Sequence, residues 1–133
     1  MGVVVYGGAI PLYEEVHPQG LLANPTVHRR FLPKLPSILP TGCRPIVMTD
    51  AGFHATWFKM VAAHGWSFVG RIRGRNRLQL ADEQWIPARD LFSRANKKAK
   101  DLGMAAYARG HPVAVRAGLG KRLPPGSHRV TIN

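Results

Sequence analysis

The sequence Pro45-Ile46-Val47-Met48-Thr49-Asp50-Ala51-Gly52 opens the stretch that decides the fold. Its apolar run from Ile46 to Thr49 is bounded by turn residues, which is typical of a strand covered on both faces and predicts a central strand. Apolar residues then recur at three- and four-residue intervals from Phe53 to His64, and Gly65 follows, so we expect an amphipathic helix that ends there. From Trp66 to Ile72 the apolar residues alternate, which predicts another strand. Strand, helix and strand in this order predict a βαβ unit with parallel strands.

The N-terminal part of the chain carries the pattern of a hairpin followed by an interrupted helix. Residues 3–6 and 10–16 are rich in β-branched and aromatic residues, and Gly7-Gly8 between them suits a tight turn. We therefore expect an antiparallel hairpin. Apolar residues at helical spacing predict a kinked or broken helix over residues 25–39, because two prolines interrupt its hydrogen bonds.

The C-terminal part shows weaker periodicity. Residues 90–102 place apolar side chains on one side and lysines on the other, which predicts a helix. From residue 103 to 133, only short strand-like pieces stand between Gly, Pro and basic residues, a composition that favours a poorly ordered tail. The expected fold class is α/β: a mixed sheet, built from the N-terminal hairpin and the βαβ unit, flanked by helices.

Charge is the clearest compositional feature. The 133 residues suit one domain, and 19 Lys and Arg against 7 Asp and Glu give a net charge of +12. Such a charge predicts an anionic partner, and nucleic acid is the leading candidate. A membrane surface is the weaker alternative, because no helix carries its basic residues along one face.

Cysteine content and hydropathy indicate where the protein works. The single cysteine, Cys43, fits a reducing cytosol, and we expect it to be a small buried hydrophobe. There is no long apolar run, and the first residues lack the pattern of a signal peptide, so a soluble, intracellular protein is predicted. Val3-Val4-Val5-Tyr6 begins directly as strand-like sequence, as if the chain were cut from a longer polypeptide.

Asp50 is the best-placed carboxylate. It follows the predicted buried strand where the chain turns into a helix, and ligand or metal sites favour this position in α/β sheets. The alternative is a capping role, since an aspartate before a helix can accept hydrogen bonds from free backbone amides. Position alone does not separate the two.

A cluster of arginines follows the next predicted strand: Arg71, Arg73, Arg75 and Arg77. Because that strand should neighbour the one that bears Asp50, these side chains could line a DNA groove and contact phosphates. The alternative is a solvated basic edge that deters pairing with other strands.

Three blocks of the sequence together resemble bacterial insertion-sequence transposases of the insertion-sequence-four type: residues 10–17 (IPLYEEVH), residues 45–53 (PIVMTDAGF) and residues 65–73 (GWSFVGRIR). Their order and spacing match as well, and the likeness covers roughly residues 1–92. The resemblance implies a ribonuclease-H-like fold, with residues 1–102 as a partial catalytic core. Residues 103–133 would then be a basic segment that continues the core.

The family's active site uses two aspartates and a glutamate to hold two divalent ions, and the resemblance assigns the second aspartate to Asp50. Two metals can activate the attacking water or hydroxyl and stabilise the leaving oxygen of a phosphodiester. Carboxylate oxygens suit Mg²⁺ or Mn²⁺. No acidic residue precedes Glu14, and nothing in residues 103–133 matches the motif that holds the glutamate. This chain is therefore expected to bind metal weakly or not at all.

The remaining acidic residues and histidines do not replace the missing ligands. Glu14 and Glu15 belong to the family block without being ligands; Asp82-Glu83 falls in a polar loop, Asp90 resembles a helix cap and Asp101 lies among lysines. His54 could face the same cleft as Asp50, and a surface or packing role is the alternative. Trp57 and Trp66 are expected in the core, and Trp85 either packs or stacks on a base.

The sequence thus favours a fragment of a DDE transposase that binds DNA at its backbone and is inactive by itself. The full-length enzyme would cut and join DNA at insertion-sequence ends. The alternative is a non-catalytic basic nucleic-acid-binding module or regulator derived from a transposase. A dimer or an association with the full-length enzyme would fit either, as would a cytoplasmic, nucleoid-associated location.

Overall fold

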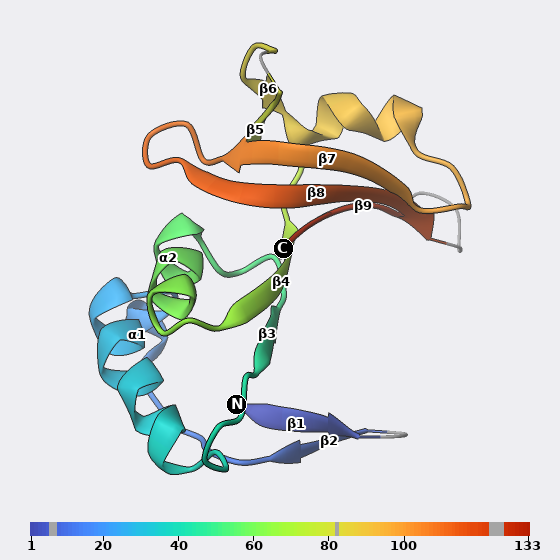
Figure 1. Ribbon diagram of the computed structural model, residues 1–133. Coiled ribbons are helices and arrows are strands. Elements are labelled where there is room, and N and C mark those ends of the chain that lie inside the picture. The colour runs from blue at the N-terminus through green and yellow to red at the C-terminus, as the bar shows by residue number, and fades with distance from the viewer. Residues whose placement is uncertain (6–7, 82, 123–126) are drawn as a thin grey trace. The chain divides into compact units, whose positions relative to one another are not determined.

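The computed structural model describes residues 1–5, 8–81, 83–122 and 127–133 (Figure 1). The chain divides into two compact units, Met1–Cys43 (unit 1) and Arg44–Asn133 (unit 2). Both units contain strands and helical segments. The protein is therefore of mixed α and β type, as the sequence predicts. The expectation that the N-terminal hairpin and the βαβ unit share one sheet is wrong, because the hairpin forms a two-stranded sheet of its own.

Unit 1 begins with a two-stranded antiparallel hairpin. Strand β1 (Gly2–Val5) pairs with β2 (Gly8–Pro11), with Gly2 opposite Pro11 and Val5 opposite Gly8. The predicted hairpin is confirmed, although β2 ends at Pro11 and does not continue to Val16. The turn expected at Gly7-Gly8 includes Gly7, which lies outside the described residues.

The rest of unit 1 is an interrupted helix, as predicted from its prolines. A 3-10 turn η1 (Gln19–Leu21) precedes α1 (Pro25–Phe31), which continues directly into a 3-10 helix η2 (Leu32–Ser37). The side chain of Asn24 caps α1, since its Oδ1 accepts a hydrogen bond from the Thr26 amide at 2.8 Å. Pro36 lies inside η2. A proline has no amide hydrogen to donate, so a regular α-helix does not continue through this segment.

Unit 2 starts with the βαβ unit that the sequence predicts. Strand β3 (Ile46–Thr49) is followed by helix α2 (Ala55–Ala63) and strand β4 (Ser67–Ile72), and β3 pairs with β4 in parallel. Gly65 has a φ of +72°, which suits the position just after the helix because glycine carries no Cβ. The predicted order and strand direction are both confirmed.

A close approach fixes α2 against the sheet. The ring of Phe58 lies over Gly70 of β4, where a Cβ would stand only 2.6 Å from the Phe58 Cε1 atom. Phe58 is fully buried and also contacts Phe68, with ring centroids 4.8 Å apart. Only glycine at position 70 leaves room for this packing.

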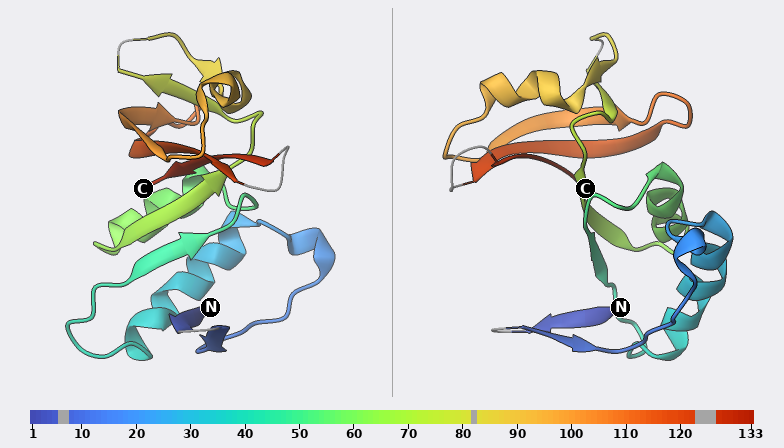
Figure 2. Two further views of the ribbon diagram at one scale, coloured as in Figure 1. Left: turned by 90° about the vertical axis from the view of Figure 1, so that its right-hand side faces the viewer. Right: turned by 180° about the vertical axis from the view of Figure 1, so that it is seen from behind.

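The remaining elements of unit 2 complete one mixed sheet (Figure 2). The strand order is β3-β4-β9-β8-β7-β5-β6, and every pair other than β3–β4 is antiparallel. These elements are β5 (Arg77–Leu80), β6 (Ile86–Pro87), the 3-10 helix η3 (Ala88–Arg94), β7 (Lys100–Tyr107), β8 (Val113–Arg122) and β9 (Ser127–Ile132).

The prediction that residues 46–49 form a central strand is wrong for the described residues. Strand β3 lies at one end of the seven-stranded sheet, and β4 is the neighbour it pairs with. Val47 is buried, whereas Ile46 and Met48 are 65% and 66% exposed. A short apolar run does not by itself distinguish a strand covered on both faces from an edge strand with one open face.

The predicted helix over residues 90–102 is also wrong. Only the short 3-10 helix η3 forms at its start, and the backbone turns extended at Ala95, with φ −77° and ψ 137°. Lys100 to Leu102 belong instead to β7, which pairs with β5 and β8. Cross-strand pairing here overrides the helical propensity of lysine, leucine and alanine.

Residues expected to form only short strand-like pieces of the tail are central to the sheet. Strand β8 is the longest, with 10 residues, and it pairs with β7 on one side and β9 on the other. The described residues after Gly103 therefore form a meander of long antiparallel strands. Residues 123–126, between β8 and β9, lie outside the described part of the chain.

The sheet has one buried and one exposed face, which we call the core face and the open face. Along β8, Val113, Val115, Ala117 and Leu119 are buried, while Ala114 and Arg116 between them are exposed. Tyr107 belongs to the core face and lies 6.0 Å from Phe58, measured between ring centroids. Alternation along the strands thus separates an apolar core from an exposed surface.

Replacing Gly70 with alanine should destabilise unit 2, because the new methyl group would overlap the Phe58 ring. We expect the free energy of unfolding to fall by about 1–3 kcal/mol, measured by urea denaturation. Gly120→Ala is the matched control, since a Cβ at that strand glycine would meet nothing within 4 Å. Equal stability of the two variants would show that Phe58 does not pack as described.

Candidate nucleic-acid interface

Asp50 follows β3 directly, at the carboxyl end of the strand. Its side chain is exposed, and its Oδ1 accepts a hydrogen bond from the Gly52 amide at 2.8 Å. Helix α2 begins later, with His54 as its N-cap residue. The carboxylate therefore stabilises the turn after β3 and does not cap the helix, which answers the capping alternative.

The strand register places Asp50 beside the first arginine of the cluster. Thr49 pairs with Gly70 in the parallel ladder, and Asp50 and Arg71 are the next residues of their strands. Ile46, Met48 and Asp50 are all exposed and alternate along the chain, as do Ser67 and Arg71 on β4. The Asp50 carboxylate and the Arg71 guanidinium are thus carried by neighbouring backbone positions.

The four predicted DNA-binding arginines are all exposed: Arg71, Arg73, Arg75 and Arg77. They alternate with buried or half-buried residues from Ile72 to Leu78. Arg71 lies on β4 and Arg77 on β5, while Arg73 and Arg75 lie in the connecting turn, which the Asn76 amide closes by donating to the Arg73 carbonyl at 2.9 Å.

The edge-protection alternative does not explain Arg71 or Arg77. Strand β4 lies between β3 and β9, and β5 lies between β7 and β6, so neither strand is an edge of the sheet. The Arg77 guanidinium donates to the Trp85 carbonyl at 3.1 Å, which holds part of this surface in place. The arginines therefore form an exposed basic ridge, for which we use the name arginine ridge (Arg71, Arg73, Arg75 and Arg77).

No group of three or more His, Cys, Asp or Glu side chains suited to holding a metal ion occurs among the described residues. His54 is exposed at the start of α2. Of the other acidic residues, Asp90 lies on η3 near Arg89, Asp101 pairs with Arg116, and Asp82 is outside the described residues. Asp50 is thus not joined by further described ligands within this chain.

Of the two tryptophans expected in the core, Trp57 is buried and Trp66 is not, and Cys43 also differs from its prediction. Trp57 is 3% exposed and belongs to the core, and Trp66 is half-buried and stacks on His64 at 4.9 Å between ring centroids. Trp85 is also half-buried. Cys43, expected to be buried, is exposed; a lone small residue carries no periodicity from which its burial could be predicted.

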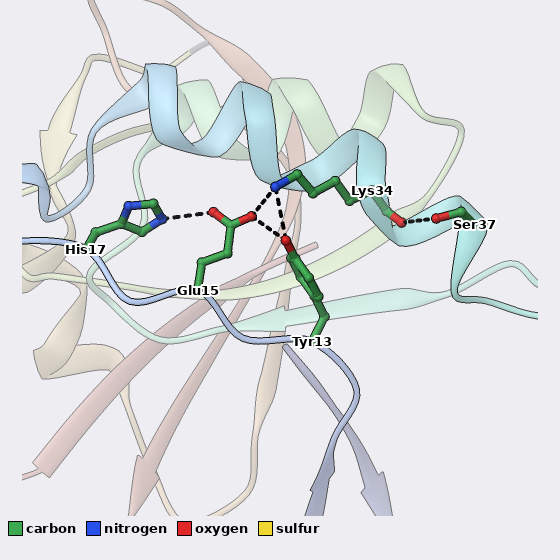
Figure 3. A network of polar contacts seen from close by, with 5 residues as sticks. All are labelled: Tyr13, Glu15, His17, Lys34 and Ser37. Carbon is green, nitrogen blue, oxygen red and sulfur yellow. Dashed lines mark hydrogen bonds and ion pairs between the residues drawn. The ribbon is translucent and has the colours of Figure 1, made fainter.

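Sequence reasoning missed a polar network in unit 1 around Glu15 (Figure 3). The Tyr13 hydroxyl donates to Glu15 Oε1 at 2.5 Å, His17 Nε2 lies 2.9 Å from Oε2, and the Lys34 ammonium bonds both Glu15 and the Tyr13 hydroxyl. The Lys34 and Tyr13 hydrogen bonds lower the pKa of Glu15 from its usual 4.5 to about 2. Glu14, by contrast, is exposed.

This network joins two parts of unit 1 that are distant in sequence. Tyr13, Glu15 and His17 come from the extended segment after β2, and Lys34 comes from η2. The Tyr13 ring also contacts Phe31, with centroids 5.3 Å apart. The arrangement fixes the extended segment on the helical part of the unit, so we regard it as structural.

Comparison with protein-family models, with curated proteins and with solved structures yields no match. The function must therefore be argued from the residues themselves. Within the described residues, the structure has no helix whose length and apolar content would let it cross a membrane.

The Glu15 network predicts a pH dependence of unit 1. Because the pKa of Glu15 is lowered on folding, its stabilising effect is complete above about pH 4.5 and is lost as the pH falls toward 2. Glu15→Gln should remove this dependence and speed exchange of the Leu12 and Tyr13 backbone amides, which both donate to the Met1 carbonyl. Hydrogen exchange measured between pH 3 and 6 tests it. Glu14→Gln, at an exposed neighbour, should behave as the unaltered chain, and a similar effect of both changes would contradict the assignment.

Proposed function

We propose that this chain is a DNA-binding part of a DDE-type transposase core, with a partial ribonuclease-H-like sheet. The observation that carries the proposal is the parallel β3–α2–β4 unit, which places Asp50 at the carboxyl end of β3 beside the exposed arginine ridge. Such a position suits a carboxylate that shares a metal ion with other ligands. The adjacent arginines suit the phosphates of the DNA that the metal would act on.

The resemblance to insertion-sequence-four transposases supports the same interpretation, because its three blocks map onto defined elements. Residues 45–53 cover β3 and the Asp50 turn, and residues 65–73 cover β4 and the first two arginines of the ridge. Residues 10–17 contain Tyr13, Glu15 and His17 of the unit 1 network. Each of the three blocks therefore corresponds to a defined part of the structure.

The exposed edge of β3 restricts the proposal to a partial core. The sequence predicts that the strand before Asp50 has neighbours on both sides, whereas the described β3 pairs with β4 alone. Asp50 also lacks the other two carboxylates in this chain. Cleavage of DNA by the purified chain in Mg²⁺ is therefore not expected, and observing it would overturn this part of the proposal.

A second candidate function, a basic binding module without catalysis, is favoured by one observation. The arginine ridge is exposed and does not depend on Asp50 for its position, so DNA binding needs no metal. The two candidates differ in whether Asp50 contributes to binding an ion. Both require the arginine ridge to contact DNA.

Removing the arginine ridge should weaken DNA binding. We expect the fourfold variant Arg71→Gln, Arg73→Gln, Arg75→Gln and Arg77→Gln to reduce the slope of log affinity against log salt by about 0.9 for each phosphate that the protein no longer neutralises. Fluorescence anisotropy with a labelled duplex at several salt concentrations measures the slope. The control variant removes the same charge at other exposed positions of unit 2: Lys59, Arg94, Lys97 and Lys98, each changed to Gln. If the slope of the control falls as much as that of the test variant, binding is not specific to the ridge.

Replacing Asp50 with asparagine separates the two candidate functions. If the chain is part of a transposase core, Asp50→Asn lowers the affinity for Mn²⁺, measured by water proton relaxation in the presence of duplex DNA, and leaves DNA affinity without metal unchanged. Asp90→Asn, another exposed aspartate, is the control. Unchanged Mn²⁺ affinity together with intact DNA binding would leave only the binding module.

A further inference from the structure

The open face of the unit 2 sheet offers a second basic surface, separate from the turn that carries Arg73 and Arg75. On β8, the open-face position Arg116 is 61% exposed at its side chain. Its cross-strand neighbour on β7, Met104, is also 63% exposed. This part of the sheet is therefore uncovered and accessible.

The strand register connects this surface to the ridge. Arg71 of β4 pairs with Thr131 of β9, and Thr131 pairs with Gly118 of β8, two residues beyond Arg116. Adjacent strands lie about 4.8 Å apart and residues rise about 3.4 Å along a strand, which puts the Cα atoms of Arg71 and Arg116 roughly 12 Å apart. Two arginines on the open face at about that separation can reach phosphates of one duplex.

Two strand glycines, Gly118 and Gly120, lie on this face beside Arg116, and internal packing does not require either of them. A Cβ at Gly118 would come no closer than 3.9 Å to another atom, the Lys100 carbonyl oxygen, and a Cβ at Gly120 would meet nothing within 4 Å. Neither glycine has a positive φ. Glycine inside a strand is less favourable than alanine, and one use of such a position is the close approach of another molecule.

Arg116 is hydrogen-bonded to Asp101 and lies beside a hollow on this face. Its Nε donates to Asp101 Oδ2 at 3.0 Å and its Nη2 bonds the same oxygen, while the Gly103 amide donates to Asp101 Oδ1 at 2.9 Å. The Arg116 hydrogen bond lowers the pKa of Asp101, so the pair stays ionised. Lys100, Asp101, Arg116 and Gly118 line an open hollow of about 390 Å³. A guanidinium has five N–H donors, and Asp101 takes only two of them.

The charge balance and the residue types favour a nucleic-acid backbone as the ligand. Sixteen of the 19 Lys and Arg fall in unit 2, against five of the 7 Asp and Glu. The described open-face residues near Gly118 include no aromatic side chain: Arg71, Asp101, Met104, Arg116 and Thr131. Single strands are usually held by stacking on aromatic rings, whereas duplexes are held mainly at their phosphates.

We propose that the open face of β7, β8, β9 and β4, centred on Arg116 and Gly118, binds the phosphate backbone of duplex DNA. This inference rests on the proposed DNA binding and extends it from the arginine ridge across the sheet. The glycines let the DNA backbone approach the strands, and Arg116 donates to a phosphate with the N–H groups that do not bond Asp101. Asp101 also weakens binding, because it adds a negative charge to the same surface.

The arginine arm of the test compares Arg116→Gln with Arg94→Gln, an exposed arginine on η3, whose Ala88 and Leu91 are buried in the core. Binding to a labelled duplex at 0.15 M salt should weaken roughly three- to tenfold for Arg116→Gln and change little for Arg94→Gln. Equal effects of the two changes would overturn the proposal.

The aspartate arm uses two exposed aspartates that each pair with an arginine. Asp101 and Asp90 have side chains 51% and 53% exposed, paired with Arg116 and Arg89. Asp101→Asn should tighten duplex binding roughly two- to fivefold, because it removes a negative charge from the binding surface. Asp90→Asn should have a smaller effect, and an equal or larger one would count against the open face.

The glycine arm changes shape without changing charge. Gly118→Thr should melt at the same temperature as the unaltered chain or higher, because threonine favours strands, and yet bind duplex DNA at least threefold more weakly. Unchanged affinity would show that DNA does not approach the sheet there. Preference for single-stranded or double-stranded RNA over the DNA duplex in competition would overturn the choice of ligand.

These outcomes separate the inference from the proposed function. If the unaltered chain shows no salt-dependent DNA binding, the proposed function fails. If it binds and the arginine ridge is needed, but Arg116→Gln and Gly118→Thr bind normally, only the open-face inference fails.

Discussion

The ring of Phe58 occupies the space that a side chain at position 70 would otherwise fill, and much of unit 2 depends on that contact. It draws α2 onto β4 and so sets the crossover between β3 and β4. The same ring reaches Phe68 and Tyr107, which belong to strands on different parts of the sheet. Through this one side chain, the parallel βαβ unit and the antiparallel meander share a core.

That shared core decides which residues remain available for binding. Because Ile72 and Leu78 are buried, the arginines that alternate with them must be exposed. The burial of Val115 and Ala117 on β8 likewise exposes Arg116 between them. The basic surface is thus a consequence of strand alternation around an apolar core, and one packing arrangement serves both stability and the presentation of charge.

The parts of the fold that sequence could predict are those with local periodicity. The βαβ unit follows from the apolar run at Ile46, the helical spacing after Phe53 and the alternation up to Ile72, and all three predict the structure correctly except for the position of β3 in the sheet. Strand β7 could not be predicted, because Lys100 and the lysines and alanines just before it favour a helix when considered alone. Its conformation is decided by pairing with β8 and with β5, and β5 is distant from β7 in the sequence.

In the candidate site, too, the features with a local sequence signal could be predicted and those set by distant residues could not. Asp50 and the arginine ridge were accessible to sequence reasoning because each lies at a recognisable strand end. The Glu15 network was not, since Lys34 reaches it from a distant helical segment. One local signal existed: Tyr13, Glu15 and His17 are two residues apart, so an extended chain presents them on one side. Arg116 was missed because β8 itself was not expected to be so long.

The unpaired edge of β3 affects which buffer suits the purified protein. Among the described residues only β4 pairs with β3, and Ile46 and Met48 are exposed; an unpaired strand edge of this kind can pair with a strand of another copy. The positive charge of each molecule opposes such stacking by mutual repulsion over distances of about 10 Å at 0.1 M ionic strength. Concentrated salt shortens that range, so a buffer chosen to keep nucleic acid off the protein also removes its protection against self-assembly.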